Sequence, residues 1–249
     1  ANKRLATLSW PAPVSIFEGY DQDRRRGVRI EGLPLYGSRF SSEELARGFR
    51  NNLEALDKIR HPASLQTYNY WSTPVSLVAV SEAFTGVSLN ARVAKGPLTW
   101  TETAKLFKPV VDLVQQAHQQ NVVHRWLHPK CILVPEIGSG RVCVWGFYGS
   151  ADGILSTMGT KQEPPDHYKP YNAPEQKAHS TQLDALKLRD VYSIGRCLCF
   201  ALTKDPYRCS SGETPPEVER LITQLDSHTP EDRAEAWAKL PRCLGEAGC

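Results

Sequence analysis

The chain has 249 residues, of which 41% are hydrophobic, 9% aromatic and 23% charged, and its formal net charge is +3. This composition is typical of a globular protein with enough chain for a sizeable core. The small charge gives no support for nucleic-acid binding, and no apolar run approaches the roughly 18 residues that a membrane span needs. Because the chain begins with Ala1 and has no signal-like apolar segment, we expect a fragment of a longer protein.

The chain has an odd number of cysteines and no C-x-x-C motif. They are Cys131, Cys143, Cys197, Cys199, Cys209, Cys243 and Cys249. Several lie in apolar runs, which predicts buried or free thiols in a reducing compartment rather than a disulfide framework. We therefore expect a cytoplasmic protein or the cytoplasmic portion of a larger one. A metal site from His124, His128 and Cys131 is an alternative, but Pro129 disfavours a helical spacing of these ligands.

The first third of the chain predicts mainly strands. Residues 8–20 predict a strand pair interrupted by two prolines, and residues 21–27 predict a solvated hairpin tip with three successive arginines. Another strand is expected at residues 28–34, and two more within residues 65–89. Residues 41–59 predict a helix that Ser41 or Ser42 would cap, because apolar residues recur along one face.

The middle of the chain predicts a long helix followed by a loop between buried runs. Residues 101–120 have apolar positions at three- and four-residue steps, and Pro109 should kink or interrupt this helix. In residues 121–134 a polar loop separates Val122 and Val123 from a second apolar run. Residues 141–145 predict a further strand, and residues 150–171 a loop.

The loop that begins at His124 and Arg125 resembles the catalytic loop of eukaryotic-type Ser/Thr protein kinases, H-R-D-L-K-P-x-N-I-L. In that family the Asp receives the substrate hydroxyl proton, the Lys contacts the transferred phosphate and the Asn holds magnesium. Those places carry Trp126, His128 and Cys131 in this chain. An indole has no acceptor for a proton, so the resemblance implies a loop without its base.

The phosphate-binding positions of the family are also replaced in the first part of the chain. The glycine-rich loop carries Ser9, Pro11 and Val14, and proline has no N–H to offer a phosphate. Glu31 stands at the place of the strand lysine, where it would repel a phosphate charge by about 4 kcal/mol at roughly 4 Å. Asn52 stands at the place of the helix glutamate that pairs with this lysine.

The D-F-G motif of the family has its counterpart at Gly146 and Phe147, where no carboxylate is available for magnesium. Ser81 stands at the gatekeeper place before the hinge. Glu175 ends an intact A-P-E motif, and the resemblance implies that it pairs with Arg233 near the end of the chain.

Asp190 stands in a D-V-Y-S-x-G motif at the start of an expected buried helix. The resemblance implies that its carboxylate accepts backbone N–H groups of the catalytic-type loop. The last helices are expected at residues 216–225 and 232–237. The segment between Pro206 and Pro216 leaves no room for a full docking helix. Aromatic residues at 167–171 suggest a contact surface for a partner.

The sequence therefore predicts an α+β, bilobal protein-kinase-like fold, with a small β-rich N-lobe that carries one C-type helix and a larger, mainly helical C-lobe. We expect one domain over residues 1–249, with the N-lobe at 8–84 and the C-lobe at 85–249. The region before the last helices is shortened. The positions with an architectural role in the family are His124, Arg125, Phe147, Glu175, Asp190 and Arg233.

The replaced positions predict a pseudokinase that is not an enzyme, needs no cofactor or metal, and is not expected to bind Mg-ATP. Its expected role is regulation or scaffolding, through a protein partner or another domain of the parent chain. Nucleic acid and a membrane span are not expected. One alternative is a small-molecule sensor that uses a cavity behind Ser81, and another is an atypical transferase.

Overall fold

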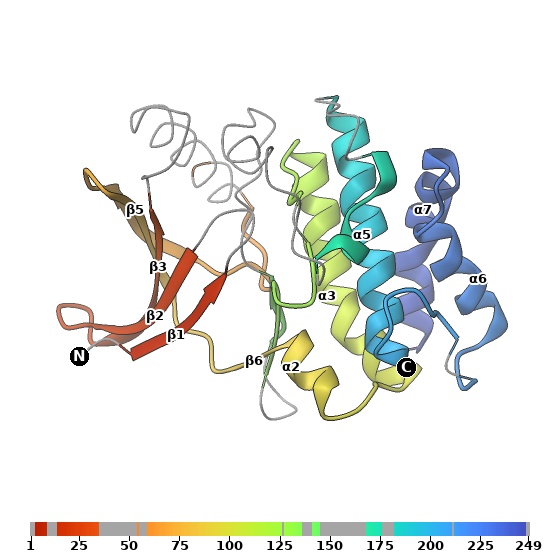
Figure 1. Cartoon of the computed structure of the whole chain (residues 1–249), viewed down its shortest axis with the longest axis horizontal. Coiled ribbons are helices and arrows are strands. Elements are labelled where there is room, and N and C mark those ends of the chain that lie inside the picture. Colours follow the sequence, from red (N-terminus) through yellow and green to blue (C-terminus); the bar gives the residue numbers. More distant parts are fainter. Residues whose placement is uncertain are drawn as a thin grey trace.

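The computed structural model describes residues 3–8, 14–34, 54, 59–125, 127–135, 141–144, 168–175, 182–210 and 212–247. A twisted β-sheet occupies one end of the molecule and a group of helices the other (Figure 1). This division agrees with the predicted α+β architecture. The predicted helix at residues 41–59 lies outside the described part, apart from Glu54 and Ile59.

The N-lobe sheet has five antiparallel strands in the order β1-β2-β3-β5-β4. Their bounds are β1 Lys3–Leu8, β2 Val14–Asp21, β3 Arg26–Pro34, β4 Thr67–Ser72 and β5 Ser76–Glu82. The hairpin between β2 and β3 is held by Asp21, whose carboxylate accepts the backbone N–H of Arg24 at 3.1 Å. Arg24 and Arg25 are exposed, as expected for a solvated tip.

A second, three-stranded sheet connects the two lobes in the order β6-β7-β8. Its strands are β6 Gly86–Ser88, β7 Ile132–Pro135 and β8 Cys143–Val144. A side chain at Gly86 would collide with the carbonyl oxygen of Val134, so the close approach of β6 to β7 requires glycine. Arg141, just before β8, pairs with Glu82 and donates to the carbonyl oxygen of Pro62 at 2.7 Å.

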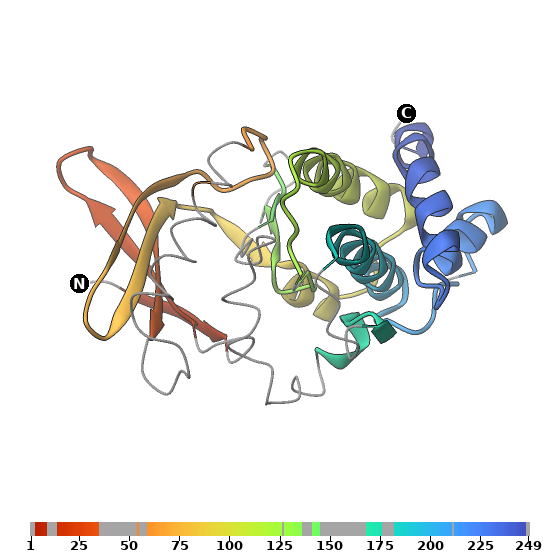
Figure 2. The ribbon, with the colours of Figure 1, turned by 90° about the horizontal axis from the view of Figure 1, so that it is seen from above.

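The C-lobe is built from helices that surround α5 (Figures 1 and 2). The helices are α2 Leu89–Ala94, α3 Trp100–Gln119, the short 3-10 helix η1 Lys169–Tyr171, α5 Leu183–Thr203, α6 Pro216–Leu225 and α7 Pro230–Ala247. α3 begins with a capping box between Thr99 and Glu102. It continues past Pro109, so the alternative that this proline interrupts the helix is wrong.

Most of the buried apolar side chains belong to the C-lobe, and fourteen residues of α5 are buried. α5 approaches the end of α6 closely at Gly195, where an added Cβ would lie 2.9 Å from the Cβ of Leu225. The described residues between α5 and α6 contain no helix, in agreement with the shortened region. Among the described helices, none combines the length and apolar character that a bilayer crossing requires.

Candidate functional site

The face of β3 that carries Glu31 holds a buried ion pair. Nε of Arg29 donates to Oε1 of Glu31 at 2.6 Å, and each residue is 7% exposed. Arg29 lies opposite Ser81 and Glu31 opposite Ala79 on β5, so these side chains share one face of the sheet. Because Arg29 neutralises Glu31, the expectation that Glu31 presents an uncompensated repulsive charge to a phosphate is wrong.

Arg29 is a site residue that the sequence comparison missed. It lies two positions before Glu31, and the period-two alternation of a strand places both side chains on the same face. That alternation was the signal that could have revealed it. Ser81 is also only 7% exposed and borders this ion pair, so its position gives no support for the cavity that a small-molecule sensor would need.

Asp190 of α5 anchors the catalytic-type loop. Its carboxylate accepts the backbone N–H groups of His124 and Arg125, both at 2.7 Å, and lies 3.0 Å from Nε2 of His118. Burial alone would raise the pKa of Asp190, but the hydrogen bonds and charges of His118 and His124 hold that pKa below its ordinary value. Arg125 has a positive φ of 68°, a conformation that the two backbone contacts stabilise.

Cys131 and His128 contact each other within this loop. Sγ of Cys131 is 3.2 Å from Nε2 of His128, while Nδ1 of His128 accepts the backbone N–H of Lys130 at 3.1 Å. Burial raises the pKa of the Cys131 thiol far above its ordinary value, so the thiol stays protonated and is a poor nucleophile. The charge of Arg29 lowers this pKa and that of Glu31 raises it, so both charges of the β3 pair act electrostatically on Cys131.

The metal site considered for His124, His128 and Cys131 is not formed by the described residues. One group in the described part has ligand atoms within 4.8 Å of one another, and it consists of Cys199, Cys209 and Asp226. The two sulfur atoms of this group are joined to each other, and the carboxylate pairs with Arg196 at 3.2 Å. The Cys199–Cys209 disulfide therefore leaves no thiolate in this group to bind a cation, and Arg196 already occupies the carboxylate of Asp226.

Several predicted positions lie outside the described residues, and they are Ser9, Pro11, Asn52, Trp126, Gly146 and Phe147. Val14 begins β2. The structure therefore places three of the replaced positions, Glu31, His128 and Cys131, around one part of the molecule. It also adds two cations to that region, Arg29 and Lys130, since Lys130 lies 5.3 Å from the ring centroid of Tyr168, which itself packs on His128.

The segment after the predicted loop is tied to the last helix. Arg233 of α7 donates to both carboxylate oxygens of Glu175, at 2.5 and 3.2 Å, and its side chain is completely buried. The aromatic contact surface expected at residues 167–171 is wrong for its described part, because Tyr168 and Tyr171 are buried. Tyr168 packs on His128 and Tyr171 on Phe200, so both rings belong to the interior.

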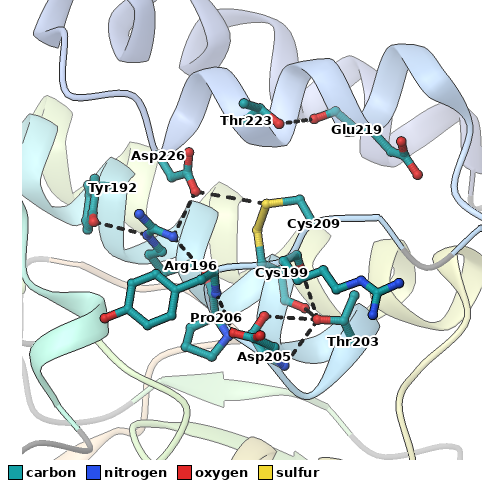
Figure 3. A network of polar contacts seen from close by, with 12 residues as sticks. Tyr192, Arg196, Cys199, Thr203, Asp205, Pro206, Cys209, Glu219, Thr223 and Asp226 are labelled. Carbon is teal, nitrogen blue, oxygen red and sulfur yellow. Dashed lines mark hydrogen bonds and ion pairs between the residues drawn. A yellow bond between two sulfur atoms is a disulfide. The ribbon is translucent and has the colours of Figure 1, made fainter.

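The expectation that the cysteines are all thiols is wrong for one pair. Cys199 near the end of α5 forms a disulfide with Cys209, with the two Cα atoms 4.3 Å apart (Figure 3). The chain turns back after α5 and brings residue 209 against the helix, a return that sequence spacing alone does not reveal. Among the described cysteines, Cys131, Cys143 and Cys197 are buried and take no part in a disulfide.

The chain matches the family described as the protein kinase domain over residues 36–242. It is 27% identical over 228 residues to the serine/threonine-protein kinase PrkC of Bacillus subtilis, covering 91% of this chain and 33% of PrkC. It is 31% identical over 110 residues to a putative CBL-interacting protein kinase 13 of Oryza sativa, covering 44% of this chain and 22% of that protein. The chain thus spans a third or less of the length of these two relatives.

Solved structures of similar fold include the kinase domain of PknI from Mycobacterium tuberculosis. A double mutant of that domain superimposes with a TM-score of 0.73 at 15% identity, covering 99% of this chain and 94% of the PknI chain. The unmutated domain gives 0.70 at 17% identity, covering 98% and 94%. At these identities the likeness shows the fold alone, which is a β-sheet N-lobe followed by a helical C-lobe.

The prediction that the chain is not an enzyme is contradicted by these comparisons, because the relatives that it matches are named as protein kinases. That prediction counted charges only at the aligned positions, and it missed that Arg29 and Lys130 bring cations to the same region. The family match covers far more than half of the sequence. The chain therefore belongs to the protein kinase domain family.

Proposed function

We propose that this protein kinase-family domain acts as a regulatory or scaffolding module that binds another protein or another domain of its parent chain. The observation that carries the proposal is a pocket of about 620 Å³ on the N-lobe sheet, with the exposed Trp71 at its rim. Tryptophan, tyrosine and arginine are the residues that most often anchor protein interfaces. All three line this pocket.

The pocket lies on the face of the sheet opposite the Arg29–Glu31 pair. Val28 and Ile30 of β3 alternate with that pair, and together with Val80 of β5 they supply the apolar lining. Arg26 lies 3.3 Å from the ring centroid of Tyr68, which fixes a cation over an aromatic face. Acidic and basic residues of the β2–β3 hairpin also line it, and they are Asp21, Asp23 and Arg24. This lining suits a protein segment with an apolar anchor and charges of both signs.

The interior of the domain supports a role that does not depend on nucleotide. Arg29 and Glu31 satisfy each other's charge on the inner face of β3, and binding at the outer face would leave this pair undisturbed. We therefore expect partner binding without Mg-ATP. Cys131, Cys143 and Cys197 stand outside the Cys199–Cys209 disulfide, which supports the further proposal that the domain works in the cytoplasm.

The test compares two exposed aromatic residues in different lobes. Trp71 is 45% exposed at the pocket, whereas Tyr207 is 63% exposed in the C-lobe and serves as the matched control. The wild-type chain, Trp71→Ala and Tyr207→Ala would each be immobilised and incubated with the full-length parent protein and with cell extract, without nucleotide. Bound proteins would be identified by mass spectrometry and their affinities measured with purified material.

The proposal expects a protein that binds the wild type and Tyr207→Ala but binds Trp71→Ala at least about tenfold more weakly, as for an interface anchor worth 1.4 kcal/mol or more. Circular dichroism melts would confirm that both variants remain folded. Equal binding by all three proteins would reject the outer pocket as the docking surface. Binding that requires Mg-ATP would reject independence from nucleotide.

A second candidate is phosphoryl transfer to protein, which the names of the relatives favour. In this case Arg29 would exchange Glu31 for a phosphate group, since a guanidinium binds either anion well. Transfer of label from γ-labelled ATP to a protein substrate by the wild type, and its loss in the double variant Arg29→Ala, Glu31→Ala, would support this candidate. Unchanged transfer in the double variant would remove Arg29 from that role.

A further inference from the structure

The loop that follows α5 is bound to the helix covalently. Cys199 is fully buried one turn before the end of α5, whereas Cys209 is half-buried and lines a pocket of about 550 Å³ (Figure 3). Tyr207, Arg208 and Thr223 of α6 line the same pocket. Cys199 therefore lies inside the helical core, whereas Cys209 is partly exposed where the loop meets α6.

The other described contacts of the loop are noncovalent. α5 ends where Lys204 takes a left-handed conformation with φ of 66°, and Arg196 donates to the carbonyl oxygen of Pro206 at 3.0 Å. The hydroxyl of Thr203 lies 2.9 Å from the carbonyl oxygen of Asp205 and 2.7 Å from that of Arg208. Because a hydroxyl has one hydrogen, it can donate to only one of them at a time. The disulfide is thus the strongest tether of this loop.

We propose that Cys199–Cys209 is a reversible disulfide, opened by a dithiol reductant that attacks the sulfur of Cys209 and thereby releases the loop and reshapes the pocket. A thiolate of the reductant forms a bond to Sγ of Cys209 while the bond between the two protein sulfurs breaks, and Cys199 leaves as a thiolate that takes a proton. The second thiol of the reductant then attacks the reductant sulfur that is bonded to Cys209. Cys209 is released as a thiol, and the reductant becomes an internal disulfide. Two electrons pass from the dithiol to the protein.

Access explains why attack occurs at Cys209. The sulfur of Cys199 lies in the fully buried part of α5, where no external thiol can reach it, and Cys209 lines the pocket. Arg196 and Arg208 line that pocket together with Asp226 and Glu219. The two guanidinium groups offset the repulsion that the two carboxylates would exert on an approaching thiolate.

In the reduced state the Cys209 thiol has a hydrogen-bond acceptor nearby, the carboxylate of Asp226. Sγ of Cys209 lies 3.9 Å from Oδ2 of Asp226, but a disulfide sulfur carries no hydrogen to donate. After reduction the Cys209 thiol can donate to this carboxylate, which Arg196 already contacts at 3.2 Å. This inference is independent of the proposed function, since it concerns the domain alone.

The first experiment labels thiols in the folded chain. Oxidised protein is treated with dithiothreitol or buffer, then with N-ethylmaleimide, and the labelled cysteines are located by peptide mass spectrometry. We expect labelling of Cys209, and more slowly of Cys199, only after dithiothreitol. The buried thiols of Cys131, Cys143 and Cys197 should stay unlabelled in both samples, which shows that the chain remains folded. Labelling of Cys209 without reductant, or no labelling after reduction, would overturn the proposal.

The second experiment compares Cys209→Ser with Cys243→Ser, a matched change at a half-buried free cysteine in α7. Loss of the bridge should lower Tm by about 5 to 10 °C in Cys209→Ser and raise amide hydrogen exchange at residues 204–209 by about tenfold or more. Reduced wild-type protein should match Cys209→Ser, and dithiothreitol should shift that variant no further. A Cys209→Ser variant that melts and exchanges like oxidised wild type would contradict the inference, and Cys243→Ser should behave as wild type in both redox states.

Discussion

The buried charged groups indicated by the family motifs in the C-lobe, and the buried ion pair of the N-lobe, differ in how far along the chain their contacts reach. In the C-lobe, Glu175 and Arg233 lie 58 positions apart and Asp190 reaches His124 across 66 positions. In the N-lobe, Arg29 pairs with Glu31 two positions away in the same strand. The C-lobe contacts hold separate elements together, whereas the N-lobe pair occupies one face of a single strand.

The two C-lobe contacts join residues that the family motifs indicated, whereas no motif indicated the pair of Arg29 and Glu31. In each of the two long-range contacts both residues match a family motif. A buried charge is destabilising once its partner is lost, so the two partners of such a contact depend on each other. In β3 the carboxylate of Glu31 is neutralised by Arg29 of the same strand. A charge that is neutralised within one strand places fewer demands on the rest of the fold than one that pairs with a distant element.

The largest effect is expected from breaking the C-lobe pair on its exposed side. Glu175→Ala leaves the completely buried Arg233 without its carboxylate partner and should reduce the free energy of unfolding by about 3 to 5 kcal/mol. Urea denaturation measures this loss. Glu235→Gln is the control, because its pair with Lys239 is exposed and should contribute less than about 0.5 kcal/mol. A small loss in Glu175→Ala would refute the architectural role of the pair.

A double-mutant cycle tests whether the N-lobe pair is only local. Arg29→Leu should cost about 2 to 4 kcal/mol of unfolding free energy, because it leaves Glu31 buried without its cation. The double variant Arg29→Leu, Glu31→Leu should recover most of this stability, since two apolar residues can replace a buried ion pair. If the double variant were as unstable as the single one, the pair would be coupled to other elements and the contrast between the lobes would fail.

Asp190→Asn should destabilise the chain by about 2 to 3 kcal/mol, because it removes the charge that accepts the N–H groups of His124 and Arg125. The folded-state pKa of Asp190 is lowered, so its contribution is complete above the unfolded value of about 3.9 and is lost as pH falls through the lower folded value. Wild type should therefore lose stability more steeply than Asp190→Asn below about pH 4.

Melting curves measured between neutral and acid pH would test this difference in slope. Asp112→Asn provides the control, because Asp112 forms an exposed pair with Lys108 within α3. This variant should melt like the wild type at neutral pH. Parallel acid curves for wild type and Asp190→Asn would show that the carboxylate does not anchor the loop.

The smallest effects are expected from two glycines in the C-lobe helices. Gly195→Ala should cost about 1 to 3 kcal/mol, because its Cβ would press against Leu225 and the backbone nitrogen of Asp226. Gly245→Ala should instead stabilise α7 by about 0.5 to 1 kcal/mol, since its Cβ would meet no atom within 4 Å. Thermal melts of both variants measure the contrast, and destabilisation of similar size at both sites would contradict it.

The sequence predicted most of the C-lobe because several of its motifs indicate both partners of a contact. Apolar periodicity predicted α3, and the family motifs indicated both Asp190 with its loop and Glu175 with Arg233. Each of these inferences rests on residue types that have few alternative partners. The division of the chain at residue 84 into two lobes stays a prediction.

The remaining contacts depend on features that a motif does not encode. Pairing of Arg29 with Glu31 follows from strand alternation rather than from an aligned letter. The disulfide depends on how the chain turns after α5, and the burial of Tyr168 and Tyr171 depends on the neighbours His128 and Phe200. Aromatic residues in a loop are equally compatible with an interface and with a core, and only the packing decides between them.

The pairing of β6 with β7 determines where the molecule can pivot. Gly86, Val87 and Ser88 pair with β7, so only residues 83–85 separate β5 of the first sheet from β6 of the second along the chain. The pair between Arg141 and Glu82 adjoins this short pivot. A rotation of the five-stranded sheet relative to the helices would therefore bend the chain at this short connection and would also act on the backbone hydrogen bond from Val144 to Ala63.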